Sequence, residues 1–272
     1  MRFFLILFCT FIVSRSIAPE IHPFVVIWDI GQGQWITVVT NNVCIHFDMG
    51  GEWLPHDSRL RPPHDPRLRP RYHDHRTPPV MKFCSDKSNR VYLSHSDMDH
   101  IKFLAWGEAH LPHLCDAAPP LDAMDAKKRA IIARVPRCHS LLPTREVNVV
   151  EITPRFKLLK FTGHNDFSRI FVIYGPNRAI LIPGDSEARA ERIWSSRLYN
   201  LPPVQILVAG HHGSKTSTSE ALLRALPDLK IAIASARKAR YGHPDPIIVA
   251  RLLTDGVPLL RTEIWGNIAL QL

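Results

Sequence analysis

Residues 91–100, VYLSHSDMDH, lead an apolar run straight into four side chains that can bind a divalent ion: His95, Asp97, Asp99 and His100. Alternate residues of an extended segment point to the same side, so the first three can converge, and a turn would bring His100 beside them. Imidazole nitrogens and carboxylate oxygens are donors for ions such as zinc, manganese and iron. The motif therefore predicts a metal site at the end of a strand.

Three further motifs place the same kinds of side chain at strand ends. ILIPGDS ends an apolar run at Asp185, and ILVAGHHGS ends another at His211 and His212. FTGHNDFS offers His164 just before the run RIFVIYG. Each lies beside a glycine, where side chains from separate strands can meet in one cleft. A lone Asp185 or His164 would equally suit a helix cap or a turn, and it is their recurrence that favours a shared site with Asp185 bridging two ions.

The apolar runs also predict the fold class. Strands are expected within 24–30, 34–40, 42–51, 169–175, 178–185, 204–214 and 230–236, and helices within 186–199, 218–227 and 245–256. Strands that are apolar almost throughout are buried on both faces, so helices should cover the sheets. The alternation of strands and helices in the C-terminal half indicates an α/β fold.

The N-terminus and the cysteines both favour an exported protein. Residues 1–18 combine Arg2, an apolar stretch over 3–13 and a small-residue end, as a secretory signal peptide does. That stretch is too short to span a bilayer, and no other segment is apolar enough, so no integral membrane segment is expected after cleavage. The remaining cysteines, Cys44, Cys84, Cys115 and Cys138, allow two disulfides in three connectivities. Cys115 with Cys138, which flank one loop-rich stretch, is the favoured pair.

Residues 19–272 are expected to form a single domain, interrupted by an exposed insertion at about 52–80. Its segment 56–79 holds six prolines, six arginines and four histidines, and contains the near repeat HDSRLRP and HDPRLRP. The prolines exclude a helix or a central strand, and the charge excludes burial. The insertion is either a solvated repeat or a loop that binds metal or phosphate. The net charge of +9 likewise suits a polyanionic partner or simple solubility.

The motifs HSDMDH, GHNDFS, IPGDS and AGHHGS together resemble those of the metallo-β-lactamase superfamily of dinuclear metallohydrolases. In finer detail, IWDIGQGQWITVVT, HFDMGG and LVAGHHGSKTSTSEALL are similar to the metallo-β-lactamase-like domain of the DNA-internalisation competence proteins, the ComEC type. The resemblance covers about residues 24–51 and 90–270. It implies a four-layer αββα sandwich.

The resemblance also implies roles for individual residues. His95 and Asp97, with His164, would hold one ion; Asp99 and His100 would hold a second; Asp185 would bridge them; and His211 and His212 would supply the last ligand or ligands. Asp29 and Asp48 would orient ligating imidazoles. Asp99 and His243 would take part in catalysis, His243 as a general acid or a phosphate ligand. Lys215 and Arg240 would contact phosphate oxygens, although an exposed surface lysine is the plain alternative for Lys215.

Two ions, Mn²⁺ or Zn²⁺, could share and activate a hydroxide. Many relatives carry histidine where this chain has Asp97, and the added oxygen donor favours harder ions and phosphodiester substrates. The resulting hypothesis is an exported phosphodiesterase that cleaves nucleic acid, DNA above all, in a secreted or periplasmic location. The alternatives are an esterase acting on phosphorylcholine or teichoic acid, and a non-catalytic polyanion-binding protein.

The chain departs from the ComEC pattern in three respects. Gln34 replaces an acidic residue, Lys102 and Phe103 replace glycines, and no polytopic membrane channel is expected within residues 1–272. DNA import is therefore not implied. The identity of the metal, the choice of DNA or RNA, endonuclease or exonuclease action and the oligomeric state stay open.

Overall fold

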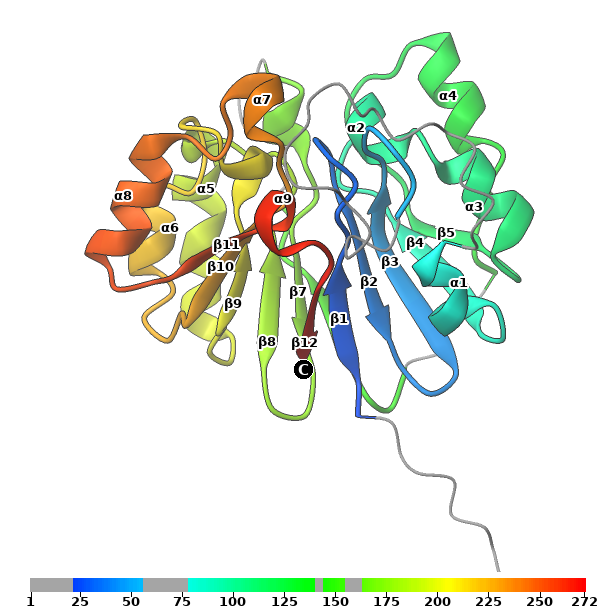
Figure 1. Ribbon diagram of the computed structural model, residues 1–272, viewed down its shortest axis with the longest axis horizontal. Helices are drawn as coiled ribbons and strands as arrows, with labels where there is room; N and C mark the ends of the chain where they lie inside the picture. Colours follow the sequence, from blue (N-terminus) through cyan, green and yellow to red (C-terminus); the bar gives the residue numbers. More distant parts are fainter. Residues whose placement is uncertain (1–21, 56–77, 140–143, 155–162) are drawn as a thin grey trace, which may run out of the picture.

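The computed structural model describes residues 22–55, 78–139, 144–154 and 163–272. Two six-stranded sheets face each other, and helices cover their outer sides (Figure 1). This arrangement confirms the predicted αββα sandwich. The predicted signal peptide, residues 1–18, lies outside the described residues, as does most of the predicted insertion.

The first sheet has the order β12-β1-β2-β3-β4-β5. Its strands are β1 (Phe24–Ile27), β2 (Trp35–Val39), β3 (Val43–Met49), β4 (Ser88–Tyr92), β5 (Cys115–Ala118) and β12 (Ile268–Gln271). The pairs β12–β1, β1–β2 and β2–β3 are antiparallel, while the pairs β3–β4 and β4–β5 are parallel. The last strand of the chain thus forms one edge of the sheet and pairs with the first strand.

The second sheet has the order β11-β10-β9-β8-β7-β6. Its strands are β6 (Asn148–Glu151), β7 (Phe171–Tyr174), β8 (Ala179–Ile182), β9 (Ile206–Val208), β10 (Ile231–Ala234) and β11 (Leu259–Arg261). β8 to β11 pair in parallel, and β6, β7 and β8 pair antiparallel. Parallel strands end at one edge of a sheet, so the loops after β8 and β9 lie together.

The helices pack on the outer faces of the sheets. On the first side these are α1 (Pro79–Cys84), α2 (Met98–Ile101), α3 (Leu104–His110) and α4 (Ala126–Ile132); on the second they are α5 (Ala188–Trp194), α6 (Glu220–Arg224) and α8 (Pro246–Thr254) (Figure 1). α7 (Lys238–Tyr241) and α9 (Thr262–Trp265) are single turns, and η3 (Asn165–Phe167), η4 (Ser195–Asn200) and η5 (Gly210–Gly213) are 3₁₀ turns. Pro79 and Val80, the last residues of the predicted insertion, belong to α1, and the side chain of Val80 is fully buried.

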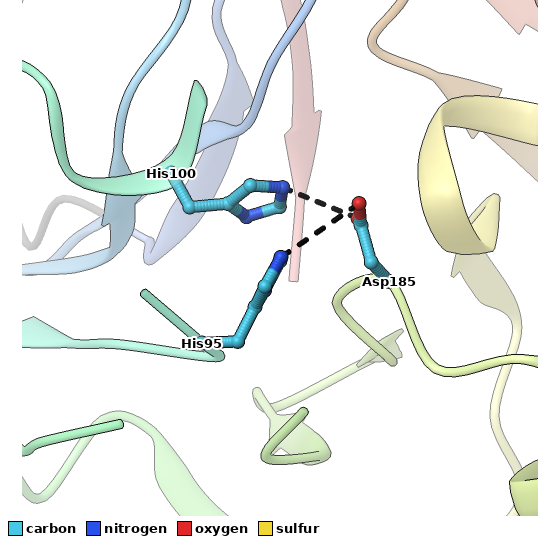
Figure 2. Close-up of side chains that lie close together, drawn as sticks. All are labelled: His95, His100 and Asp185. Carbon is cyan, nitrogen blue, oxygen red and sulfur yellow. Dashed lines mark ion pairs between the residues drawn. The ribbon is translucent and has the colours of Figure 1, made fainter. Parts of the chain in front are cut away.

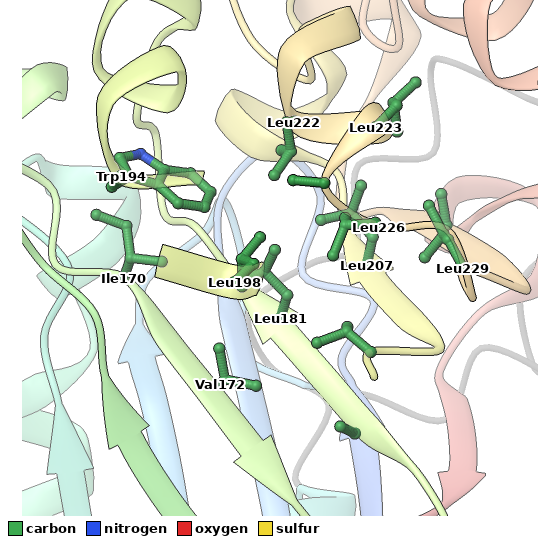
Figure 3. Packing of buried hydrophobic residues seen from close by; sticks show 14 of the residues in the cluster. Ile170, Val172, Leu181, Trp194, Leu198, Leu207, Leu222, Leu223, Leu226 and Leu229 are labelled. Carbon is green, nitrogen blue, oxygen red and sulfur yellow. The ribbon is translucent and has the colours of Figure 1, made fainter. Parts of the chain in front are cut away.

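Helix α8 shows how local sequence sets these elements. The Asp245 carboxylate accepts the Ile247 amide at 2.9 Å, and Pro246 occupies the first turn, where its missing N–H costs nothing. Ile248 and Leu252, four residues apart, form one buried face. That face packs into the core between the second sheet and its helices, which also contains Trp194. Figure 3 shows part of this core. A separate apolar cluster fills the space between the two sheets.

Two disulfides tie the first half of the domain. Cys115 is bonded to Cys138, the pairing favoured from the sequence, and Cys44 is bonded to Cys84. They close loops of 40 and 23 residues, for which chain entropy predicts about 3–4 kcal/mol of stabilisation each. Within the described ranges, no helix has the length and apolar character needed to cross a membrane.

His46 is buried in β3, and we therefore expect the folded state to lose stability in acid. Its Nε2 lies 3.0 Å from Asn89 Oδ1, and Trp35 Nε1 donates to its Nδ1 at 3.3 Å. Burial lowers its pKa from 6.5 to about 4. Because the folded state binds this proton more weakly than the unfolded chain, the stability it contributes is complete above pH 6.5 and is lost as the pH falls. We expect about 3 kcal/mol of unfolding free energy to be lost by pH 4.

The measurement is urea unfolding with a chelator present, at pH 7 and pH 5. His46→Gln should lower the stability at pH 7 but flatten its decline toward pH 5, whereas the matched variant of exposed His139, His139→Gln, should decline as the natural protein does. Equal slopes in all three proteins would contradict the assignment.

Candidate metal centre

The predicted motifs meet at one edge of the two sheets. The HSDMDH motif spans the loop after β4 and helix α2, Asp185 follows β8, and His211 and His212 lie in η5 directly after β9. Asp48 lies near the end of β3, beside the β4 loop. Side chains from both sheets therefore face each other across the sandwich.

The structure brings five of the predicted ligands into two overlapping groups: His95, His100 and Asp185 form one, and Asp99, His100 and His212 form the other. Within each group the potential ligand atoms lie within 4.8 Å of one another. Asp185 Oδ1 is 3.2 Å from His100 Nε2, and Asp185 Oδ2 is 3.9 Å from His95 Nε2 (Figure 2). His212 Nε2 lies 3.3 Å from an Asp99 oxygen and 3.6 Å from Asp185 Oδ2.

The hydrogen bonding of two atoms in the first group indicates whether a metal ion fits there. His95 Nε2 is buried and has no hydrogen-bond partner among the described residues, and buried Asp185 Oδ1 has only His100 Nε2 nearby, at 3.2 Å, without the geometry of a hydrogen bond. Buried polar atoms nearly always have one. Both atoms point into the same group, and both are donors for a divalent cation. The residues present therefore fit a metal ion.

Neighbouring groups fix the orientation of two of these imidazoles. His100 Nδ1 lies 2.8 Å from Asp48 Oδ2, and His212 Nδ1 lies 3.1 Å from the Ser235 carbonyl oxygen. A proton on each Nδ1 leaves each Nε2 lone pair facing the cluster. Asp48 is itself fully buried and accepts from the Ser94 amide and from Gln34 Nε2, each at 2.7 Å.

The charges of the cluster shift the pKa values of its members. Burial would lower the pKa of His100, but Asp185 and Asp48 raise it well above 6.5. Burial would raise the pKa of Asp185, but His212, His100 and His95 hold it well below 3.8. The pKa of Asp99 falls to about 2 despite burial, chiefly through the hydrogen bond with His212. Several carboxylates thus attract positive charge to this point.

Backbone conformation allows the loops to approach. Gly184 has φ +56°, and a Cβ there would lie 2.7 Å from Ser94 Cβ, so glycine lets the Asp185 loop contact the HSDMDH loop. His211 and His212 both have positive φ, 49° and 57°. Non-glycine residues adopt this region at a cost of about 1–3 kcal/mol, and such residues cluster at functional sites.

Asp97 has a cationic neighbour that the sequence did not indicate. Its Oδ2 lies 3.6 Å from His95 Nε2, while Lys128 Nζ of α4 donates to its Oδ1 at 2.6 Å. The His95 ring and the Lys128 ammonium lower its pKa. One carboxylate oxygen thus lies near His95 and the other is held by lysine, and Asp97 belongs to neither of the two groups, so its role as a metal ligand stays a prediction. Lys128 lies 31 residues along the chain, within an ordinary helix, and no local pattern distinguishes it.

His164 is outside both groups. Its side chain is 61% exposed, and its Nδ1 lies 3.9 Å from Asp122 Oδ2. Asp122 is a buried carboxylate that accepts from Ser96 Oγ and was not singled out from the sequence. Because residues 155–162 before His164 lie outside the described part of the chain, its role as a ligand of the first ion stays a prediction.

The structure places the other predicted residues as follows. His211 Nε2 is 3.7 Å from Asp185 Oδ2, and the His243 ring centroid lies 6.1 Å from that of His211. Burial and the nearby imidazoles lower the pKa of His243. Asp29 is buried, and its backbone contacts Asn267 and Trp53. Lys215 is exposed on the loop after η5, and Arg240 is exposed on α7.

The amino-acid sequence of the chain is similar to those of known proteins. No protein-family model matches the sequence. The chain is 25% identical over 258 residues to competence protein ComA of Neisseria gonorrhoeae, covering 91% of this chain and 32% of that protein. It is 37% identical over 105 residues to recombination protein 2 of Haemophilus influenzae, covering 38% of this chain and 13% of that protein. The chain spans a third or less of the length of these curated relatives.

Solved structures share the architecture at low sequence identity. CmlA, a diiron β-hydroxylase from Streptomyces venezuelae, superposes with a TM-score of 0.58 at 12% identity, covering 94% of this chain and 55% of that one. YhfI from Bacillus subtilis, a metallo-β-lactamase fold protein, gives 0.54 at 10% identity, covering 92% and 99%. At this identity the likeness shows the fold alone.

Proposed function

We propose that this chain, a metallo-β-lactamase-fold domain similar to the ComEC-type domain of the competence proteins, is an exported metal-dependent phosphodiesterase that cleaves DNA. One observation carries the proposal: the buried ligand atoms of His95, His100 and Asp185 gather where the two sheets meet, and His95 Nε2 has no hydrogen-bond partner in the described chain. Such atoms suit divalent ions, and the groups that share His100 suit two of them.

Two divalent ions, when bound, supply an activated water and neutralise charge on the attacking and leaving oxygens of a phosphodiester. The residues of the chain prepare the site for them. Asp48 holds the proton of His100 on Nδ1, and the Ser235 carbonyl does the same for His212. His243, with its lowered pKa and its ring near His211, can exchange a proton with a leaving oxygen once it is hydrogen bonded to it.

The fold alone does not choose the reaction, because a diiron β-hydroxylase shares it. Three observations favour DNA. The relatives are named for competence and recombination, processes that handle DNA. Asp97, where many relatives carry histidine, adds an oxygen donor suited to hard ions. The net charge of +9, with Arg240 and Lys102 beside Asp99, favours a polyanion.

The two disulfides support export. Structural disulfides persist in oxidising compartments and are rare in the cytosol. Both bonds, Cys44–Cys84 and Cys115–Cys138, lie within the packed first half of the domain. Together with the signal-like residues 1–18, they favour a periplasmic or extracellular location.

The test is hydrolysis by the purified protein with Mn²⁺ or Zn²⁺, offered plasmid DNA, single-stranded RNA and a choline phosphodiester in parallel. We expect DNA to be cleaved, and we expect Asp97→Ala to abolish cleavage. Cleavage of the choline ester with DNA intact would replace the nuclease proposal by the phosphorylcholine esterase. Binding of DNA without any hydrolysis would support the non-catalytic alternative.

A further inference from the structure

A pocket of about 260 Å³ opens directly beside the candidate metal centre. Asp99, Lys102, Arg240 and Tyr241 are among the residues that line it. The carboxylate of Asp99 belongs to the group with His100 and His212, so the pocket and the metal centre share a wall. A substrate whose scissile phosphate lies at Asp99 would extend its neighbouring part into this pocket.

Three cationic side chains contact Glu52 at the rim of the pocket. Arg237 Nη1 lies 3.0 Å from Glu52 Oε2, and Arg240 Nε lies 3.8 Å from Glu52 Oε1. Lys102 Nζ donates to the Glu52 carbonyl oxygen at 2.9 Å. Three positive charges against the two carboxylates of Glu52 and Asp99 leave this part of the pocket with a net charge of about +1. Arg240 keeps 58% of its side chain exposed and can offer its remaining N–H groups to a phosphate.

An exposed aromatic ring completes the pocket. Tyr241 is 60% exposed, whereas Trp28, Trp35 and Trp194 are fully buried in the core. The Arg240 guanidinium lies 5.3 Å from the Tyr241 ring centroid. The guanidinium thus lies over one face of an exposed ring, at a pocket that adjoins the candidate metal centre, and unpaired bases stack on combinations of aromatic rings and arginines of this kind.

We propose that this pocket is a nucleotide subsite, in which Tyr241 stacks the base next to the scissile phosphate and Arg240 and Lys102 contact the adjoining phosphate. The inference rests on the proposed function, because it takes nucleic acid as the substrate. A base inside a duplex is stacked on its neighbours and cannot cover a side-chain ring. The subsite therefore selects single strands, or the frayed ends of duplexes, over intact duplex.

The test measures the affinity of the protein for a fluorescein-labelled single-stranded DNA 12-mer, from its fluorescence anisotropy at a fixed salt concentration. The 12-mer has phosphorothioate linkages, which resist hydrolysis. Tyr241→Ala should weaken binding by about tenfold to a hundredfold. Tyr241→Phe keeps the ring face and should bind within about twofold of the natural protein. A blunt duplex of the same length should lose little affinity on either change. Tyr199→Ala, which removes a tyrosine that is 68% exposed on η4, is the matched control.

Equal single-strand binding by Tyr241→Ala and the natural protein would overturn the subsite, and so would equal losses for single strand and duplex. Displacement of the 12-mer by millimolar phosphocholine would also overturn it, since the pocket would then take choline. The two proposals fail separately. Tyr241-dependent binding without cleavage of any DNA would refute the nuclease and leave the subsite. Cleavage of DNA with binding independent of Tyr241 would refute only the subsite.

Discussion

Replacing Asp185 with asparagine should lower hydrolysis by about a thousandfold or more and weaken metal binding. Asp185 is buried, and its two oxygens lie between 3.2 and 3.9 Å from ring nitrogens of four histidines: His95, His100, His211 and His212. Asparagine keeps the shape but removes the negative charge that two ions would share. Stabilisation of transition-state charge by such ions amounts to several kcal/mol, and about 1.4 kcal/mol corresponds to a factor of ten in rate.

The measurement pairs the metal content of the purified variant with its rate on DNA. Asp228→Asn, on an exposed turn after α6, is the matched control and should keep both metal and activity. A variant of Asp185 that retains the metal content and the rate of the natural protein would contradict both the bridging role and the two-metal reaction. Loss of metal with an unchanged far-ultraviolet spectrum would show that the defect lies at the site and not in the fold.

The sequence predicted the central strands and the site motifs because both depend on local signals. Apolar runs mark strands buried on both faces, and all seven expected runs contain strands in the structure. Short edge strands such as β6, β11 and β12 carry weaker signals. β12 takes its place by pairing with β1, more than 240 residues away, and no local pattern anticipates such a partner. Long-range pairing of this kind is fixed by the closure of the core.

Within the candidate site, the same division between local and long-range signals applies. His95, Asp97, Asp99 and His100 lie within six consecutive residues, in the loop after β4 and the first turn of α2, so their spacing was informative. Lys128 reaches Asp97 from a separate helix, and Asp122 reaches Ser96 from a loop, so only the fold brings them together. Gln34 was noted as a departure from an acidic residue. The structure supplies a reason for the amide: Gln34 donates to Asp48 Oδ2, where a carboxylate would meet a like charge in a buried place.

Asp48→Ala is the second change with a large expected effect, on both stability and metal affinity. Asp48 is fully buried and accepts four hydrogen bonds, two from Ser94 and one each from Gln34 and His100, all between 2.7 and 2.8 Å. Alanine leaves these donors without their acceptor. Breaking a buried charged pair costs about 3–5 kcal/mol of unfolding free energy. Loss of the contact that orients a ligating imidazole typically weakens metal affinity by about tenfold to a hundredfold.

The two effects separate experimentally, because the stability loss is present without metal. Urea unfolding with a chelator should show the deficit of Asp48→Ala, and titration of the folded variant with Mn²⁺ or Zn²⁺ should show the weaker binding. Asp86→Ala removes a carboxylate that is 77% exposed and lies 3.6 Å from Lys87, so it should change neither quantity measurably. If Asp48→Ala lost stability but bound metal as tightly as the natural protein, the hydrogen bond to His100 would serve the fold alone. The Nε2 of His100 would then face the cluster because of core packing, and the ligand role of His100 would not depend on Asp48.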